Sequence, residues 1–479
     1  MEFALGICIV AFLSLVALAF YYEHPKAEIP QGVDQPIKLY IVHYIVNLVF
    51  GLGRIFEKLG ICKEVYLIRT FLYGILPWKN TKLFIKDLEF ANVSVRVYQP
   101  KMPSAGLRTG VLYLHGGIGQ IGSISKKFKE TKTYDKYEAL SSSFYYDIWY
   151  FAAKSFLLWK FVLILGFLFS DHTQIFPLIG DTGHRKIGGL VNLMNSFCQK
   201  GMYERVCRFI ARESDSVVVC VGYRLAPEHP YPTQFWDCLA TARHFMMTAE
   251  DYGVDSARII ICGDSSGGTL TAAVCQALVS RTDLPKPRAQ IMLYPFLQAL
   301  DFNLPSYQQN GSVPLLLRNR AVALGLQYLN KDLSLMKGIL EGSHVPKDLK
   351  LKFGKWLSPD NIPVEFKTRG YKPHVPSSYS EELHTMAKQA FETTFSPLLA
   401  EDAIVCQLPE AFILTCEYDV VRDDGLLYKK RLEDNGVPVT WYHAENGFHG
   451  MLFLIDYGVV SFPCGKRAMG SVVNFIKGL

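Results

Sequence analysis

The sequence predicts an α/β fold in which a mostly parallel central sheet is flanked by helices on both faces. Short apolar runs rich in β-branched residues recur from residue 91 onward, and helix-like segments separate most of them. Because these runs are continuously apolar, they are typical of strands buried on both faces of a parallel sheet. In such sheets, functional residues gather in the loops at the carboxyl ends of the strands.

Strands and helices are expected in alternation along the chain. Strands are expected at residues 91–100, 109–117, 215–223, 257–264, 289–296, 410–419 and 439–447. Helices are expected at residues 238–249, 269–280 and 424–434, with a last one that runs up to Leu479.

An apolar, uncharged segment lies at the start of the chain. Residues 3–22 are long enough to cross a bilayer as a helix. A cleaved signal peptide is the alternative, but the segment lacks a basic n-region and ends in bulky aromatic residues instead of small ones. We therefore expect an uncleaved transmembrane signal-anchor at residues 1–22. The few flanking charges do not decide its orientation.

Composition excludes some classes of partner and site. The formal net charge is +6 over 479 residues, without a basic run, so no nucleic-acid partner is expected. The 11 cysteines show neither CxxC pairs nor metal-ligand spacing, so we interpret them mainly as buried thiols and expect no metal or cofactor. Asn92 and Asn310 begin N-x-S triplets and are candidate glycosylation sites.

A G-x-S-x-G motif, with Gly263, Ser265 and Gly267, lies between a predicted strand and a predicted helix. In this context the motif forms a sharp turn that raises the serine hydroxyl above the sheet, as a nucleophile requires. Side chains at the two glycine positions would collide with the neighbouring strand and helix. The helix that follows favours negative charge at its N-terminus. A glycine-rich turn without a catalytic role is the alternative, because the bare motif also occurs by chance.

A serine hydroxyl needs a base to become a nucleophile, so an acid and then a histidine are expected downstream of it. Asp419 ends a predicted strand and is the candidate acid, with Asp423 and Asp424 as rivals. His449 follows the next strand in a loop and is the candidate base. Its rival, His443, lies within an apolar strand, where a structural role is more common.

Donors for the oxyanion of a tetrahedral intermediate are expected near His115-Gly116-Gly117, a segment that follows a strand and precedes the serine in the chain. Glycines allow backbone N–H groups to turn toward a reacting carbonyl oxygen. The amides of Gly116, Gly117 and Ser266 are therefore the candidate oxyanion hole.

These motifs, together with GYRLAPEHPYP at residues 222–232, resemble those of the hormone-sensitive-lipase branch of the α/β-hydrolases. The apolar N-terminus and the segments IMLYPFLQALDFNLPSYQQN, YDVVRDDGLLY and ENGFHG narrow the resemblance to the arylacetamide deacetylase-like family. The resemblance implies an α/β-hydrolase fold with a helical cap and the same serine, aspartate and histidine as its catalytic triad. It also implies a single-pass type II membrane protein whose catalytic domain faces the lumen of the endoplasmic reticulum.

The chain departs from the family pattern at Ile118, where the usual HGGG loop has its third glycine. The backbone N–H is retained, but a β-branched residue cannot easily adopt a positive φ. We therefore expect a displaced loop. The loss of one oxyanion donor typically lowers turnover by about a hundred- to a thousandfold.

A second departure is an insert at residues 126–201, which the family does not have and which is far longer than ordinary loops. It interrupts a catalytic domain expected at residues 86–479, which follows a cap and linker region at residues 23–85. Excising the insert would join GSIS to MYERV, and Ser125-Lys126 can be encoded by AGTAAG, which resembles a splice donor. We interpret the insert as translated intron sequence. A functional insert with an interfacial or buried helix near residues 155–170 is the alternative.

The sequence therefore predicts a membrane-anchored serine hydrolase that cleaves hydrophobic esters, amides or acylglycerols through an acyl-enzyme. Apolar residues before the first strand and parts of residues 304–395 are expected to cap the substrate pocket. The competing hypothesis is a catalytically weak or inactive ligand-binding protein on the same fold. The presence of all three triad residues favours the enzyme.

Overall fold

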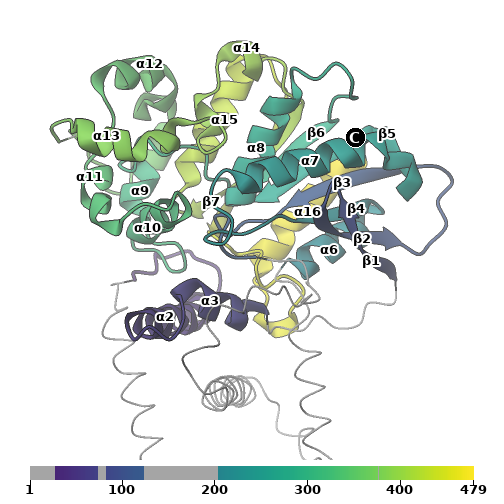
Figure 1. Cartoon of the computed structure of the whole chain (residues 1–479), viewed down its shortest axis with the longest axis horizontal. Helices are drawn as coiled ribbons and strands as arrows, with labels where there is room; N and C mark the ends of the chain where they lie inside the picture. The colour runs from purple at the N-terminus through teal and green to yellow at the C-terminus, as the bar shows by residue number, and fades with distance from the viewer. Residues whose placement is uncertain (1–26, 74–81, 123–202, 376) are drawn as a thin grey trace, which may run out of the picture. The chain divides into compact units, whose positions relative to one another are not determined.

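One sheet organises the part of the chain that the structure describes (Figure 1). The computed structural model describes residues 27–73, 82–122, 203–375 and 377–479, so the expected anchor at residues 1–22 and the expected insert at residues 126–201 lie outside it. The eight strands of the sheet have the order β1-β2-β4-β3-β5-β6-β7-β8. They are β1 (Leu83–Phe90), β2 (Val93–Pro100), β3 (Arg108–Leu114), β4 (Val217–Gly222), β5 (Val254–Asp264), β6 (Ala289–Leu293), β7 (Glu410–Tyr418) and β8 (Val439–Phe448).

The sheet is mostly parallel, as predicted. All neighbours from β4 to β8 pair in parallel, whereas β1 pairs with β2, and β2 with β4, in antiparallel fashion. Every strand predicted from the sequence is present. The exception to the prediction is β1, an edge strand with alternating exposure. It joins β2 through a two-residue turn, Ala91-Asn92, in which both residues have a positive φ, as tight hairpins require.

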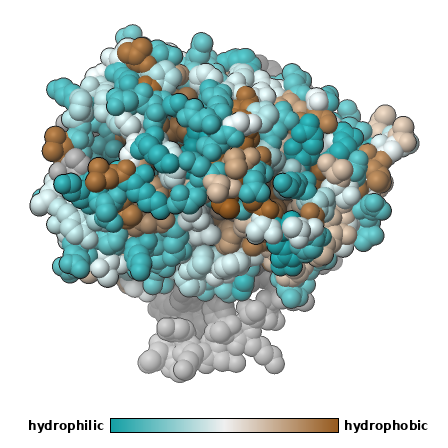
Figure 2. Space-filling view, turned by 90° about the horizontal axis from the view of Figure 1, so that it is seen from above, coloured by the Kyte–Doolittle hydropathy of each residue, from teal (hydrophilic) through white to brown (hydrophobic). Residues whose placement is uncertain are grey.

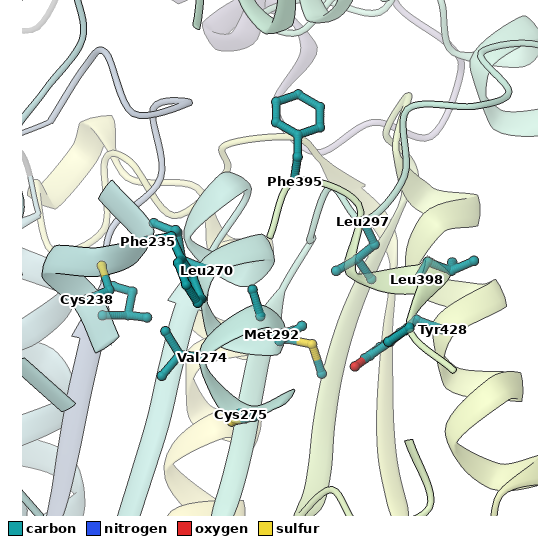
Figure 3. Close-up of a cluster of buried hydrophobic side chains, with 14 of the residues drawn as sticks. Phe235, Cys238, Leu270, Val274, Cys275, Met292, Leu297, Phe395, Leu398 and Tyr428 are labelled. Carbon is teal, nitrogen blue, oxygen red and sulfur yellow. The ribbon is translucent and has the colours of Figure 1, made fainter. Parts of the chain in front are cut away.

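Helices cover both faces of the sheet. They are α6 (Glu204–Ser214), α7 (Thr233–Met247), α8 (Ser266–Leu278), α15 (Arg422–Asp434) and α16 (Pro463–Gly478). Leu112 and Leu114 of β3 share a core cluster with α7, α8 and α15, part of which Figure 3 shows around α8. Val111 and Tyr113 face the opposite side and share a second cluster with α6 and α16. Successive residues of one buried strand therefore fill two different cores.

Further helices lie outside these two layers. Between β6 and β7 the chain forms α9 (Pro305–Gln309), α10 (Arg318–Tyr328), α11 (Met336–Leu340), α12 (Lys347–Leu357), α13 (Glu381–Ala387) and α14 (Asp402–Val405) (Figure 1). Before the sheet it forms α2 (Pro36–Lys58) and α3 (Glu64–Tyr73). Short 3₁₀ helices lie at Ala249–Tyr252, Leu333–Leu335, Pro359–Asn361, Val364–Lys367, Lys388–Phe391, Pro397–Leu399 and Gly458–Val460.

Helix α2 is attached to the segment around the start of α10 by polar contacts. His43 accepts a hydrogen bond from the Leu315 N–H at 3.1 Å, and Asn47 accepts one from the Arg320 guanidinium at 2.7 Å. Among the described residues, α2 is the one helix that is long and apolar enough to cross a membrane. Half of its most apolar stretch is buried inside the protein, so the helix alone is weak evidence for an anchor.

Polar residues dominate one face of the described protein (Figure 2), and most of its described cysteines lie in the interior. The face seen in Figure 2 is mostly hydrophilic, with hydrophobic residues scattered over it. The described cysteines are all free thiols, and most of them are buried, as predicted. The buried ones are Cys207, Cys220, Cys238, Cys262, Cys275, Cys416 and Cys464.

The two candidate glycosylation sites differ in their surroundings. Asn92 is exposed at the β1–β2 turn. Asn310 is fully buried, and its amide nitrogen donates to the backbone carbonyl oxygens of Glu417 and Asp419 at 3.0 and 2.9 Å. The prediction of a glycan at Asn310 is wrong for the folded protein, because the acceptor nitrogen is inaccessible and both of its hydrogens are engaged.

Candidate active site

The turn between β5 and α8 holds Ser265 in a strained backbone conformation. Ser265 has φ 53° and ψ −123°, a combination that residues other than glycine seldom adopt. A Cβ atom at Gly263 would lie 2.2 Å from the Gly267 carbonyl oxygen, and one at Gly267 would lie 2.0 Å from the Leu114 carbonyl oxygen. The expected collisions at both glycine positions are confirmed. The Ser265 N–H donates to the Leu293 carbonyl at 2.8 Å, which fixes the turn to β6.

Three predicted residues that lie far apart in the chain meet here in one line of hydrogen bonds. Ser265 Oγ is 2.9 Å from His449 Nε2, and His449 Nδ1 is 2.8 Å from Asp419 Oδ2. Asp419 follows β7 and His449 follows β8. Because these strands are parallel to β5, both residues lie at the carboxyl ends of the strands, on the side of the sheet where α8 begins. The Asp419 side chain is fully buried, and its second oxygen accepts the Val421 N–H at 2.9 Å.

The rival residues are engaged elsewhere. Asp423 accepts the Ser306 N–H at 2.6 Å, and Asp424 accepts the Leu297 N–H at 2.8 Å. Burial raises the pKa of the Asp424 carboxyl to about 7. His443 is bound to two side chains of β7, at 2.9 and 3.2 Å.

The three predicted oxyanion donors do not share one environment. The N–H groups of Gly117 and Ser266 have no acceptor among the described residues. The Gly116 N–H donates to Asp264 Oδ1 at 3.0 Å. The prediction for Gly116 is therefore wrong for this structure, because the Asp264 carboxylate already accepts from that amide. Asp264 ends β5 at the turn into α8, residues 263–267, which we call the elbow.

Ile118 adopts the backbone conformation that its side chain disfavours. Its φ is 48°, although we expected a β-branched residue to avoid a positive φ and to displace the loop. Its N–H donates to Ser266 Oγ at 2.7 Å. The Gly117 carbonyl accepts the N–H groups of Gln120 and Ile121 at 3.0 and 2.9 Å. These bonds hold the loop in place around the strained residue.

The His115 side chain, directly before the two glycines of the loop, packs inside the protein. Its ring is fully buried and stacks on Tyr223 and Tyr203, with centroids 4.1 and 5.0 Å away. The Tyr223 hydroxyl donates to the His115 carbonyl oxygen at 2.7 Å. Burial lowers the pKa of His115 to about 4, so the imidazole is neutral at physiological pH.

Asp264 is a site residue that sequence reasoning missed. Its Oδ1 accepts the Tyr113 hydroxyl at 2.8 Å as well as the Gly116 N–H at 3.0 Å, so it ties the loop after β3 to the elbow after β5. Burial raises the pKa of its carboxyl to about 6. The sequence signal was its position directly before Ser265, in the variable place of the motif.

An aromatic wall, formed by Tyr231, Phe296, Tyr328 and Phe395, lies beside the elbow and the loop. Phe395 contacts the other three rings, with centroid distances of 5.7 to 6.0 Å. A Cβ atom at Gly119 would lie 2.3 Å from the Tyr328 ring, so the wall closely approaches the loop. The Phe296 N–H lies 3.4 Å from the carbonyl oxygen of the elbow serine. Apart from residue type, no sequence pattern joins these positions.

Comparisons with known proteins agree with this fold. A family model described as the alpha/beta hydrolase fold matches residues 189–340 and 371–453. Among solved structures, the chain is similar to a thermostable esterase from Pseudomonas putida ECU1011, with a TM-score of 0.53 and 19% identity over 94% of this chain and 98% of that one. It is also similar to carboxyl esterase 2 of the fungus Tuber melanosporum, with a TM-score of 0.50 and 17% identity over 84% and 88%. At these identities the likeness shows the fold.

Curated relatives show the family. Arylacetamide deacetylase-like 4 of Homo sapiens is 37% identical over 98% of this chain and 97% of its own length. Arylacetamide deacetylase-like 3 of the same species is 38% identical over 100% and 97%. Arylacetamide deacetylase of Rattus norvegicus is 32% identical over 94% and 95%. The chain therefore belongs to the arylacetamide deacetylase family of the α/β-hydrolases and is a carboxylic ester hydrolase.

Proposed function

We propose that the protein is a serine hydrolase that cleaves esters of hydrophobic substrates through an acyl-enzyme on Ser265. The observation that carries the proposal is the pair of hydrogen bonds, 2.9 and 2.8 Å long, that links Ser265 through His449 to Asp419. The strained turn at the N-terminus of α8 supports the same role, because it exposes the hydroxyl next to unpaired amides.

Each residue of the site has one task in this mechanism. His449 Nε2 removes the hydroxyl proton while Ser265 Oγ bonds to the substrate's carbonyl carbon. Asp419 orients the imidazole and stabilises its charged form. The carbonyl oxygen becomes an oxyanion that accepts hydrogen bonds from the Gly117 and Ser266 amides. His449 then protonates the leaving alcohol, and water repeats the steps on the acyl-enzyme, which releases the acid and restores Ser265. No cofactor takes part.

The aromatic wall supports a hydrophobic substrate. The Tyr328 ring approaches the loop at Gly119, and the Phe296 backbone approaches the elbow. We therefore propose that an acyl or aryl group bound to Ser265 lies against this wall. We propose small hydrophobic esters as the substrate class, with amides and acylglycerols as further members. The name of the rat relative, arylacetamide deacetylase, supports the inclusion of amides.

A membrane anchor and a lumenal catalytic domain are part of the proposal. The length and apolarity of residues 3–22 support the anchor, and the free thiols of the buried core neither favour nor oppose a lumenal location. We propose a single-pass type II protein of the endoplasmic reticulum.

We further propose that residues 126–201 are translated intron sequence. The family match begins at residue 189, after the oxyanion loop and most of this segment, which supports an interruption between the two. A processed transcript that joins the codons of GSI to those of MYERV within a residue is the expected observation. If the protein without this segment folds but has lost hydrolase activity, the result would support a functional insert instead.

A fluorophosphonate probe tests the central proposal. It should label the wild-type chain and fail to label Ser265→Ala, and only the labelled protein should hydrolyse short- and long-chain acyl esters. Absence of label from both proteins would favour the catalytically inactive, ligand-binding alternative, which the strained Ile118 loop makes worth testing.

A further inference from the structure

We propose that the Ser266 hydroxyl group is a third donor to the oxyanion, polarised from behind by the Ile118 amide. The inference rests on the proposed function of Ser265. The Ile118 N–H donates to Ser266 Oγ at 2.7 Å. The third amide of the loop therefore acts on a side chain of the elbow instead of facing the substrate directly.

The hydrogen bonds of Ser266 leave one donor unused. Ser266 Oγ accepts the Ile118 N–H, but its own hydrogen has no acceptor among the described residues. The residue is only 8% exposed. A buried hydroxyl hydrogen without a partner is costly, so such a group normally has an acceptor in the working state of the protein. The oxyanion that forms during catalysis would be that acceptor.

The position of Ser266 fits this role. It directly follows Ser265 and is the first residue of α8, and its own N–H is one of the two unpaired amides of the site. The Ile118 N–H fixes the hydroxyl oxygen of this residue beside the loop that also holds the unpaired Gly117 amide. Hydrogen bonds in series polarise one another, so the N–H···O–H pair donates more strongly than a free hydroxyl.

The proposed donor adds one hydrogen bond to the mechanism and no covalent step. As Ser265 Oγ bonds to the carbonyl carbon, the carbonyl π electrons move to oxygen, which then accepts hydrogen bonds from the Gly117 N–H, the Ser266 N–H and the Ser266 O–H. When the tetrahedral intermediate collapses, the electron pair returns to the C–O bond and the three donors are released. Each donor keeps its hydrogen throughout.

The test compares Ser266→Ala with the wild-type chain in ester hydrolysis. The expected result is a fall in kcat on the order of a hundredfold, the usual effect of losing one oxyanion donor, with KM unchanged. Affinity for an alkyl trifluoromethyl ketone, which adds to Ser265 as a tetrahedral oxyanion, should fall by a similar factor. Ser266→Thr, which retains a hydroxyl, should recover part of both.

Two further variants separate this role from a structural one. Thr271→Val removes another buried hydroxyl of α8, which donates to the Gly267 carbonyl at 2.9 Å, and should leave kcat within about twofold. Ile118→Gly relaxes the loop while it retains the N–H. The ratio of kcat between Ile118→Gly and Ile118→Gly/Ser266→Ala therefore gives the contribution of the hydroxyl in an unstrained loop.

The outcomes are distinct. Equal or faster turnover of Ser266→Ala, in either background, overturns the inference and means that the hydroxyl only occupies the Ile118 amide. If Ser266→Ala does not fold, the comparison in the Ile118→Gly background decides. If the wild-type chain neither hydrolyses esters nor takes the fluorophosphonate label at Ser265, the proposed function itself fails.

Discussion

At the scale of single residues, the site depends on two unfavourable backbone states. Ser265 and Ile118 have φ values of 53° and 48°, and each such state costs on the order of 1–3 kcal/mol. Neighbouring groups stabilise both: the Leu293 carbonyl accepts the Ser265 N–H, and the Ser266 hydroxyl accepts the Ile118 N–H. The strain lies where the chemistry is proposed, and the rest of the domain sustains it.

Asn310 is a residue whose role is structural although its sequence context suggested a glycan. Replacing it with Ala should lower the free energy of unfolding by about 2–4 kcal/mol, because two buried carbonyl oxygens lose their donor. Since one of these carbonyls belongs to Asp419, kcat should fall as well. Urea unfolding and ester hydrolysis measure the two effects. Asn474→Ala, on an exposed position of α16, is the matched control and should change neither.

Asp264 should make stability depend on pH. Its pKa in the folded protein, about 6, lies above the ordinary value of 3.8, so the folded state holds the proton more tightly than the unfolded state. Its stabilising contribution is therefore complete below about pH 4 and is lost as the pH rises through 6. Between pH 5 and pH 7.5 the loss should be about 1–2 kcal/mol.

Asp264→Asn isolates this contribution. The variant retains an oxygen that can accept from Tyr113 and Gly116 but cannot ionise. Urea unfolding at the two pH values should show a smaller decrease in stability for the variant than for the wild-type chain. Parallel pH dependence of the two proteins would mean that Asp264 does not titrate in this range.

At the scale of elements, the sheet and its covering helices could be predicted from the sequence. Continuous apolar runs identified the central strands β3 to β7, because strands buried on both faces need few polar positions. Their β-branched and aromatic residues identified β2 and the edge strand β8. The alternating edge strand β1 and the helix α6 were missed. Their apolar residues are interleaved with charged ones, so the pattern of either is weak without its partner.

The elbow between β5 and α8 has little room for added side-chain atoms. Gly267→Ala would place a Cβ atom 2.0 Å from the Leu114 carbonyl oxygen, so α8 would have to move away from β3. We expect destabilisation of at least about 3 kcal/mol and loss of ester hydrolysis. Gly470→Ala in α16 has open space around its Cβ and should be neutral or slightly stabilising. Thermal unfolding of both variants compares them directly, and equal effects would refute the close contact.

At the scale of the whole molecule, the strand order brings residues from distant parts of the chain to one edge. The loop after β3, the elbow after β5 and the residues after β7 and β8 meet there because these strands run parallel within one sheet, so their carboxyl ends lie on the same side. The family relationship extends over nearly the full length of the chain.

The proposed lumenal orientation can be read from glycosylation. In cells that direct the chain to the endoplasmic reticulum, the exposed Asn92 should carry the glycan, and Asn92→Gln should abolish the mobility shift produced by an endoglycosidase. Ser312→Ala removes the Asn310 acceptor triplet without touching the buried amide and should leave the shift unchanged. A shift that persists in Asn92→Gln would contradict this assignment, and no shift in any of the proteins would argue against the lumenal orientation.

The sequence by itself determined the fold class, the family, and which serine, acid and histidine to examine, because these follow from local patterns and chain order. It favoured Asp419 over its rivals without showing what each carboxylate contacts, and it misassigned the Gly116 amide and Asn310. Only the tertiary structure decided these points, because the partner of a donor or carboxylate is set by distances across the sheet. The hydrogen bond between Ile118 and Ser266 illustrates this, since it joins positions 148 residues apart and no local pattern records it.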